Sequence, residues 1–198
     1  MRTIHALAVT AKGYTWPETA KHKIVGGTVK IATQSAYAHA AIVLDFPDGS
    51  CATYEMLAPV ITKTEGRVYS PENCEPGQYA EVTFEITDEA FDSLFAYLQF
   101  CLDKPVKYAL WTGCLVAAIE AITHDALGNE AGQSVGNFLD ENWSDRINDA
   151  MMCSELVTNC LRVTGLQLLP GLRAGAIPPD QYIEACFDLA NSLAGMPS

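Results

Sequence analysis

The sequence predicts an α+β domain in which helices pack against an antiparallel sheet. Short apolar segments with strand-like patterns fill the first part of the chain, and longer segments with helical periodicity follow from residue 87 onward. With 49% hydrophobic and 18% charged residues, the 198-residue chain can bury a sizeable core. We therefore expect residues 1–198 to form a single domain.

The predicted strands lie mostly in the first half of the chain. Tyr37–Phe46 (YAHAAIVLDF) is apolar on both faces, as in a central strand that is covered on each side. Tyr79–Ile86 alternates, so that its even-numbered residues share one apolar face. The other predicted strands are Ile4–Val9, Thr28–Thr33 and Cys51–Met56.

Helical signals dominate the remainder of the chain. Thr87 can cap a helix that has an acidic first turn, and Pro105 ends it. Gly165 suits the left-handed position that follows a later helix. The buried stripe of the first helix is Phe91, Leu94, Phe95 and Leu98, and the later helices are Tyr108–Thr123, Met151–Val163 and Asp180–Ala190.

The turn Pro47–Gly49 predicts the register of a hairpin. Pro, Asp and Gly in this order suit a three-residue loop that consists of a type I turn followed by a left-handed glycine. That loop places Glu55 opposite Ala41, so His39 and Glu55 become diagonal neighbours on one face. A two-residue loop would place them on opposite faces.

A His–Glu pair on an apolar hairpin indicates one of two roles. A buried carboxylate is costly unless it is paired, and His39 is the natural partner of Glu55. Glu55 can fix the tautomer of the imidazole and stabilise the imidazolium, as the orienting residue of a catalytic base does. The alternative is a purely structural pair.

The third candidate residue is Cys153, near the start of a predicted helix. Asp145 or Asp149 can cap that helix, which leaves Cys153 in its first or second turn. Free backbone N–H groups there lower the pKa of a thiol and can bind the oxyanion of a tetrahedral intermediate. The alternative is a core cysteine, because Cys153 has helical spacing with Leu156 and Cys160.

Three segments together resemble a known family. The runs SAYAHAAIVL, ATYEM and MMCSELVTNCLRVTG, followed by IPPDQYIEA, resemble the circularly permuted NlpC-type papain-like proteins, in particular the YiiX-like group. The resemblance implies a papain-like fold and a triad of Cys153 as nucleophile, His39 as base and Glu55 as orienting acid. It also implies hydrolysis of an amide or peptide bond, for example in cell-wall peptides, without a cofactor.

The chain also departs from that pattern. Met152 stands where the family usually has an aromatic residue, and Tyr37 can supply a pocket hydroxyl instead. We take Tyr37, Met152 and Ser154 as candidate substrate-binding residues. Residues 115–149 have no counterpart in the family and are a candidate lid or insert.

The charge and cysteine content of the chain argue against several classes of binding partner. The net charge of −12 and the absence of a Lys/Arg cluster argue against nucleic acid and anionic membranes, and favour a cationic, neutral or zwitterionic substrate. The seven cysteines have irregular spacing without a CxxC pair, so we expect reduced thiols and no metal site. We see no secretory leader and no membrane-spanning segment, and we expect a cytoplasmic protein with a peptide-like or acyl small-molecule substrate.

Two other functions stay open at this point. Lipid acyl transfer or deacylation occurs on the same fold, although those proteins carry an Asn-Cys-Glu-His type segment where this chain has Met-Cys-Ser-Glu. The other is a binding or structural module without catalysis, for example in a phage particle or a bacterial complex.

Overall fold

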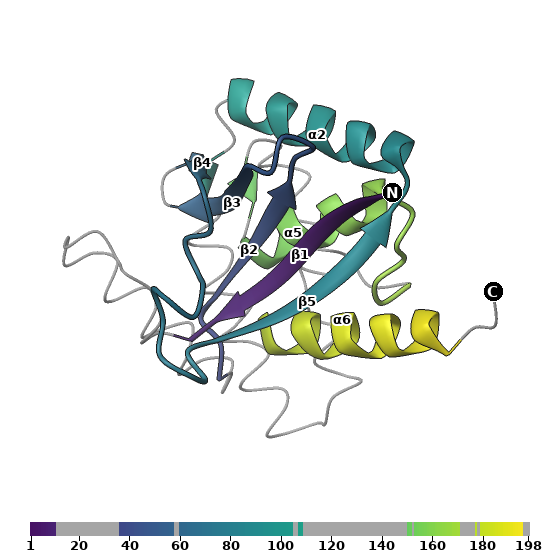
Figure 1. Ribbon diagram of the computed structural model, residues 1–198. Coiled ribbons are helices and arrows are strands. Elements are labelled where there is room, and N and C mark those ends of the chain that lie inside the picture. Colours follow the sequence, from purple (N-terminus) through teal and green to yellow (C-terminus); the bar gives the residue numbers. More distant parts are fainter. Residues whose placement is uncertain are drawn as a thin grey trace.

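A computed structural model of the 198-residue chain describes residues 1–10, 36–57, 60–104, 107–108, 150–151, 153–170, 177 and 179–195. Over these residues it has an α+β fold in which helices pack on an antiparallel sheet (Figure 1). The predicted strand Thr28–Thr33, the body of the predicted helix Tyr108–Thr123 and the candidate lid at 115–149 lie outside the described residues.

Five antiparallel strands form the body of the sheet. They are β1 (Arg2–Val9), β2 (His39–Asp45), β3 (Cys51–Leu57), β4 (Val60–Glu65) and β5 (Tyr79–Ile86). Two-residue strands β6 (Lys107–Tyr108) and β7 (Ala150–Met151) extend the β4 edge, which gives the order β5-β1-β2-β3-β4-β6-β7. β6 pairs antiparallel with β4, and β7 pairs parallel with β6. β2 lies inside the sheet and is buried from His39 to Leu44, as its apolar sequence predicts.

Three described helices, α2 (Asp88–Asp103), α5 (Cys153–Val163) and α6 (Pro179–Ala194), pack on one face of the sheet; in Figure 1, α5 lies behind the strands, with α2 above it and α6 below it. Thr87 caps α2 as predicted, because its hydroxyl accepts a hydrogen bond from the backbone N–H of Ala90 at 3.2 Å. Gly165 follows α5 with φ +87°, and the N–H of Leu166 bonds to the carbonyl of Leu161 at 3.1 Å. This is the Schellman ending that the glycine predicts.

Three predicted boundaries are wrong. Met151 belongs to β7 and Tyr108 to β6, because their backbones pair with each other in the sheet instead of continuing helices. The helix therefore begins at Cys153, and neither Asp145 nor Asp149 directly precedes it as a cap. The last helix extends to Ala194 instead of ending at Ala190.

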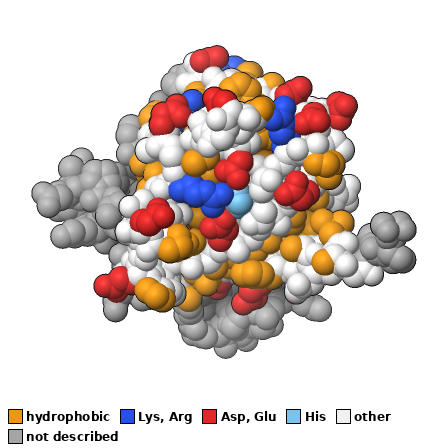
Figure 2. All heavy atoms as spheres, viewed as in Figure 1, with side chains coloured by type: hydrophobic (Ala, Val, Ile, Leu, Met, Phe, Trp, Pro, Cys, Tyr) orange, Lys and Arg blue, Asp and Glu red, His pale blue; other side chains and the backbone are white. Residues whose placement is uncertain are grey.

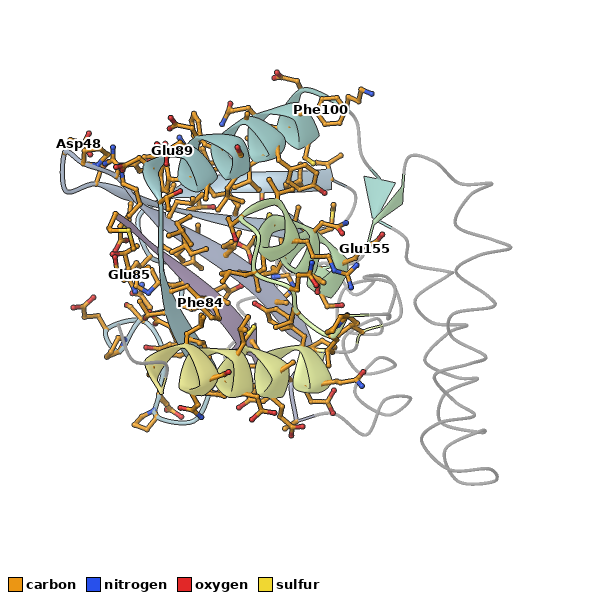
Figure 3. All side chains as sticks on the ribbon, turned by 90° about the vertical axis from the view of Figure 1, so that its right-hand side faces the viewer. Asp48, Phe84, Glu85, Glu89, Phe100 and Glu155 are labelled. Carbon is orange, nitrogen blue, oxygen red and sulfur yellow. The ribbon has the colours of Figure 1, made fainter. Side chains whose placement is uncertain are left out.

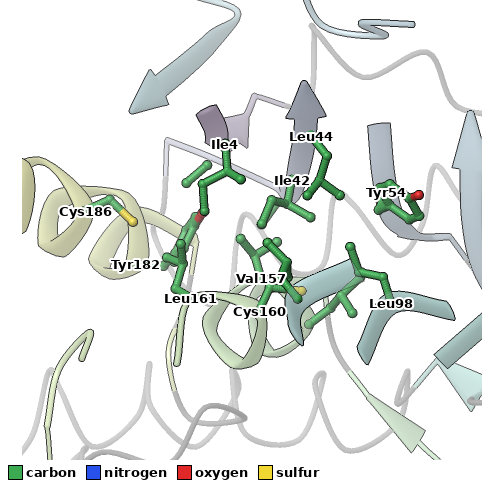
Figure 4. Close-up of a cluster of buried hydrophobic side chains, with 14 of the residues drawn as sticks. Ile4, Ile42, Leu44, Tyr54, Leu98, Val157, Cys160, Leu161, Tyr182 and Cys186 are labelled. Carbon is green, nitrogen blue, oxygen red and sulfur yellow. The ribbon is translucent and has the colours of Figure 1, made fainter. Parts of the chain in front are cut away.

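The main core lies between the sheet and the helices (Figure 4). Even-numbered residues of β1, β2, β3 and β5 point into it, so the alternation predicted for residues 79–86 is confirmed. A smaller cluster of odd-numbered residues lies on the opposite face, where Tyr69 packs against strand residues. That smaller cluster contains Leu7, Val9, Ala41, Val43 and Tyr69.

Candidate active site

The hairpin between β2 and β3 has the predicted register. The N–H of Phe46 bonds to the carbonyl of Ser50 at 2.8 Å, and Gly49 has φ +82°. Ala41 lies opposite Glu55. The turn chemistry therefore places His39 and Glu55 on the same face, because a loop one residue shorter would invert one strand relative to the other.

His39 and Glu55 form a short buried hydrogen bond. Nε2 of His39 lies 2.8 Å from Oε2 of Glu55, and the two residues are 4% and 3% exposed. Since a carboxylate only accepts, the ring donates its Nε2 proton to Glu55. This bond orients the ring and leaves Nδ1 as the nitrogen that can hydrogen-bond to Cys153 and transfer a proton.

Cys153 is the first residue of α5 and hydrogen-bonds to His39. Burial acts to raise the pKa of its thiol, but the bond to His39, the charge of that ring and the backbone N–H groups of Ala40 and Ser154 lower it overall. A helix start is also the place where backbone N–H groups lack partners within the helix. The thiolate is therefore favoured at this position.

The charges of His39 and Glu55 complement that thiolate. Burial acts to lower the pKa of His39, but the hydrogen bonds and charges of Cys153 and Glu55 raise it to about 9. Burial acts to raise the pKa of Glu55, whereas His39 and the hydroxyl of Tyr69 lower it below its ordinary value. All three shifts act in the same sense and favour the charged forms, a thiolate, an imidazolium and a carboxylate, over the neutral ones.

The end of the β2–β3 ladder brings the sulfur and the ring together. The pairing between these strands ends at Ala41–Glu55, whereas His39 and Ala40 continue to pair with β1 on the other side. The backbone N–H of Ala40 bonds to the sulfur of Cys153 there. The hairpin turn is remote from this site: Figure 3 shows Asp48 at the opposite end of the sheet from Glu155 in the first turn of α5.

Tyr69 is a member of the cluster that the sequence did not predict. Its hydroxyl donates a hydrogen bond to Oε2 of Glu55 at 2.7 Å, and the residue is 2% exposed. It lies between β4 and β5 in a segment that has neither strand alternation nor helical periodicity. Only the fold reveals its position, because periodic patterns carry no information about such a segment.

The predicted substrate-binding residues have mixed outcomes. Ser154 is buried, and its backbone N–H bonds to the sulfur of Cys153. Tyr37 is half-buried and packs against the main core cluster. Met152 lies outside the described residues. A substrate contact for any of them stays a prediction.

No protein-family model, no curated protein and no solved structure matches the chain.

Among the described residues, no group of three or more His, Cys, Asp or Glu side chains could hold a metal ion. Their six cysteines are free thiols, as predicted; Cys114 lies outside these residues. Within the same ranges, no helix is both long enough and apolar enough to cross a bilayer.

Proposed function

We propose that this protein is a thiol hydrolase that cleaves an amide or peptide bond, with Cys153 as nucleophile, His39 as base and Glu55 as orienting acid. The observation that carries the proposal is the continuous buried chain of hydrogen bonds from the sulfur through the imidazole to the carboxylate. A nucleophile, a base and a group that orients the base form the minimal set for acyl transfer.

In the acylation step, the thiolate of Cys153 attacks the substrate carbonyl carbon and the carbonyl electrons move to oxygen. Backbone N–H groups at the start of α5, including that of Cys153, are suited to hold this oxyanion. When the C–N bond breaks, His39 gives its Nδ1 proton to the leaving amine. The products of this step are a thioester on Cys153 and a free amine.

In the deacylation step, a water molecule attacks the thioester carbonyl. The now neutral His39 accepts the proton of that water at Nδ1, and the thioester C–S bond breaks to release a carboxylic acid. Glu55 keeps the ring oriented throughout, because its bond to Nε2 does not change partner. The thiolate–imidazolium pair is then restored.

We further propose that the fold is a circularly permuted papain-like fold and that the substrate is peptide-like. The order His39, Glu55, Cys153 along the chain and the position of the cysteine at a helix start support this assignment. The net charge of −12 favours a cationic or neutral substrate over an anionic one. The cytoplasmic location expected from the sequence stays a prediction.

Alkylation by iodoacetamide near pH 6.5 tests the proposed nucleophile. We expect Cys153 to react about tenfold or more faster than any other described cysteine, because a lowered thiol pKa leaves more thiolate at this pH. Mass spectrometry of peptides after a short pulse measures the rate at each site. The more exposed Cys51 and Cys74 would react first if access alone governed the rate.

Two variants complete this experiment. His39→Ala should remove the reaction at pH 6.5 and leave only reaction at alkaline pH, because the thiolate loses its cationic partner. Cys160→Ala is the matched control, since Cys160 lies in the same helix and its burial raises the pKa of its thiol. Equal labelling of Cys153 and Cys160, or a rate unaffected by His39→Ala, would contradict the hydrolase and favour a non-catalytic module.

A further inference from the structure

We propose that Tyr69 is the positioning residue of this site, and that its hydroxyl holds the Glu55 carboxylate in the orientation and charge state that His39 requires. The inference rests on the function proposed above. Tyr69 has no place in the triad that the sequence predicts, and the proposed mechanism assigns it no bond-making or proton-transfer step.

The geometry puts two donors on one carboxylate oxygen. Oε2 of Glu55 accepts from Nε2 of His39 at 2.8 Å and from the hydroxyl of Tyr69 at 2.7 Å. All three side chains are almost completely buried. The rings of Tyr69 and His39 lie 6.3 Å apart with a tilt of 57°, so they also pack against each other. Rotation of the carboxylate would break both bonds at once.

The segment of residues 66–78 is tied to β3 next to Glu55, which fixes Tyr69. The hydroxyl of Thr53 donates to the carbonyl of Gly66 at 2.8 Å and accepts from the N–H of Val68 at 3.1 Å. The side-chain amide of Asn73 then donates to the carbonyl of Val68 at 3.2 Å. Since Thr53 lies two residues before Glu55 on the same face of β3, these bonds hold the segment in a position from which Tyr69 reaches the Glu55 carboxylate.

The electrostatic effect of the Tyr69 hydroxyl follows from burial. Burial raises the pKa of Glu55, and the bonds from His39 and Tyr69 are what lower it. Without the hydroxyl, Glu55 takes up a proton at a higher pH. His39 then loses its anionic partner, and the thiolate of Cys153 loses its imidazolium in turn.

The test is the pH profile of Cys153 alkylation in Tyr69→Phe, which keeps the ring and removes one oxygen. The acid limb is the pH range in which alkylation slows as the pH falls. We expect it to move to higher pH by about one unit, because the free energy of one hydrogen bond to a charged group corresponds to about one pKa unit. Titration of the Glu55 carboxyl carbon by NMR should show a rise of similar size. Tyr79→Phe is the matched control, because Tyr79 packs against the same cluster on the same face of the sheet.

Two outcomes separate this inference from the proposed function. If Cys153 of the unmodified protein shows no rapid alkylation, the hydrolase proposal fails. If that reaction is rapid but the alkylation of Cys153 slows at the same acidic pH in Tyr69→Phe and in Tyr79→Phe, Tyr69 does not position Glu55. Thr53→Val supplies a second variant should Tyr69→Phe fold poorly, and it should move the acid limb in the same direction by a smaller amount.

Discussion

At the scale of single residues, three almost completely buried ionisable side chains, those of Cys153, His39 and Glu55, favour one another's charged forms. A buried carboxylate or imidazolium alone would be costly, and each becomes acceptable here because its neighbour has the opposite charge. The sequence predicted the pair of His39 and Glu55, since a His and a Glu on one face of an apolar hairpin need each other, and it offered Cys153 separately, as a thiol near the start of a predicted helix. It did not predict Tyr69, because nothing in the composition of residues 66–78 indicates which side chain turns toward Glu55.

Glu55→Gln should destabilise the protein in a pH-dependent way. Removing one partner of a buried ion pair costs about 3 kcal/mol in the free energy of unfolding. The pKa of His39 is raised from 6.5 to about 9 in the fold, so its share of this stability is complete below about pH 6.5 and is lost as the pH rises through 9. The lowered pKa of Glu55 makes its share complete above about pH 4.5 and lost at lower pH.

Urea denaturation measures this prediction. The difference in unfolding free energy between the unmodified protein and Glu55→Gln should be greatest between about pH 5 and 6.5 and should shrink by pH 9.5. A difference that stays constant over this range would show that the pair is not ionised in the fold.

At the scale of elements, the hairpin and the start of α5 build the site. The hairpin register follows from three consecutive residues, because Gly49 adopts the left-handed conformation that the loop requires. The start of α5 was predicted two residues too early, since the pairing of Met151 in β7 depends on residues far away in the chain. This later start puts Cys153 at the first helical position.

Changing the register of β3 should have an effect that a loss of stability alone does not have. Deletion of Ala52 keeps the turn but moves Glu55 one position along β3, onto the face opposite to His39, and should abolish the rapid alkylation of Cys153. Gly49→Ala keeps the loop length and should only destabilise the fold by about 1 kcal/mol, because its φ of +82° is strained for alanine while its surroundings are open. Circular dichroism and the iodoacetamide pulse measure both effects; rapid alkylation in the deletion variant would contradict the register argument.

At the scale of the whole molecule, the described helices bury one face of the sheet, and the opposite face carries the smaller apolar cluster around Tyr69 and polar side chains. Figure 2 shows acidic side chains spread over that second face, with a basic group and a histidine among them near its centre. His5 lies on this face, 2.9 Å from Asp45 and 2.7 Å from Glu81. The main core, in contrast, is apolar, and α5 packs within it against β2, β3, α2 and α6.

Truncation of a buried side chain of α5 should therefore lower the free energy of unfolding far more than truncation of an exposed side chain. Leu156 is fully buried, and Leu156→Ala should lower the free energy of unfolding by about 3 kcal/mol because it leaves a cavity. Phe100→Ala is the control, since Phe100 is 52% exposed, and it should change stability by less than about 1 kcal/mol. Equal effects in urea denaturation would mean that α5 is not part of the core.

The sequence alone determined the features that depend on neighbouring residues: the Pro47–Gly49 turn, the alternation of β5, the Thr87 cap and the glycine after α5. These signals act over a few residues, so they can be interpreted without knowing the fold. Tertiary structure decided the approach of Cys153 to His39, the first residue of α5 and the bond from Tyr69 to Glu55. Each of these joins segments separated along the chain, and such contacts depend on how the sheet and helices pack together.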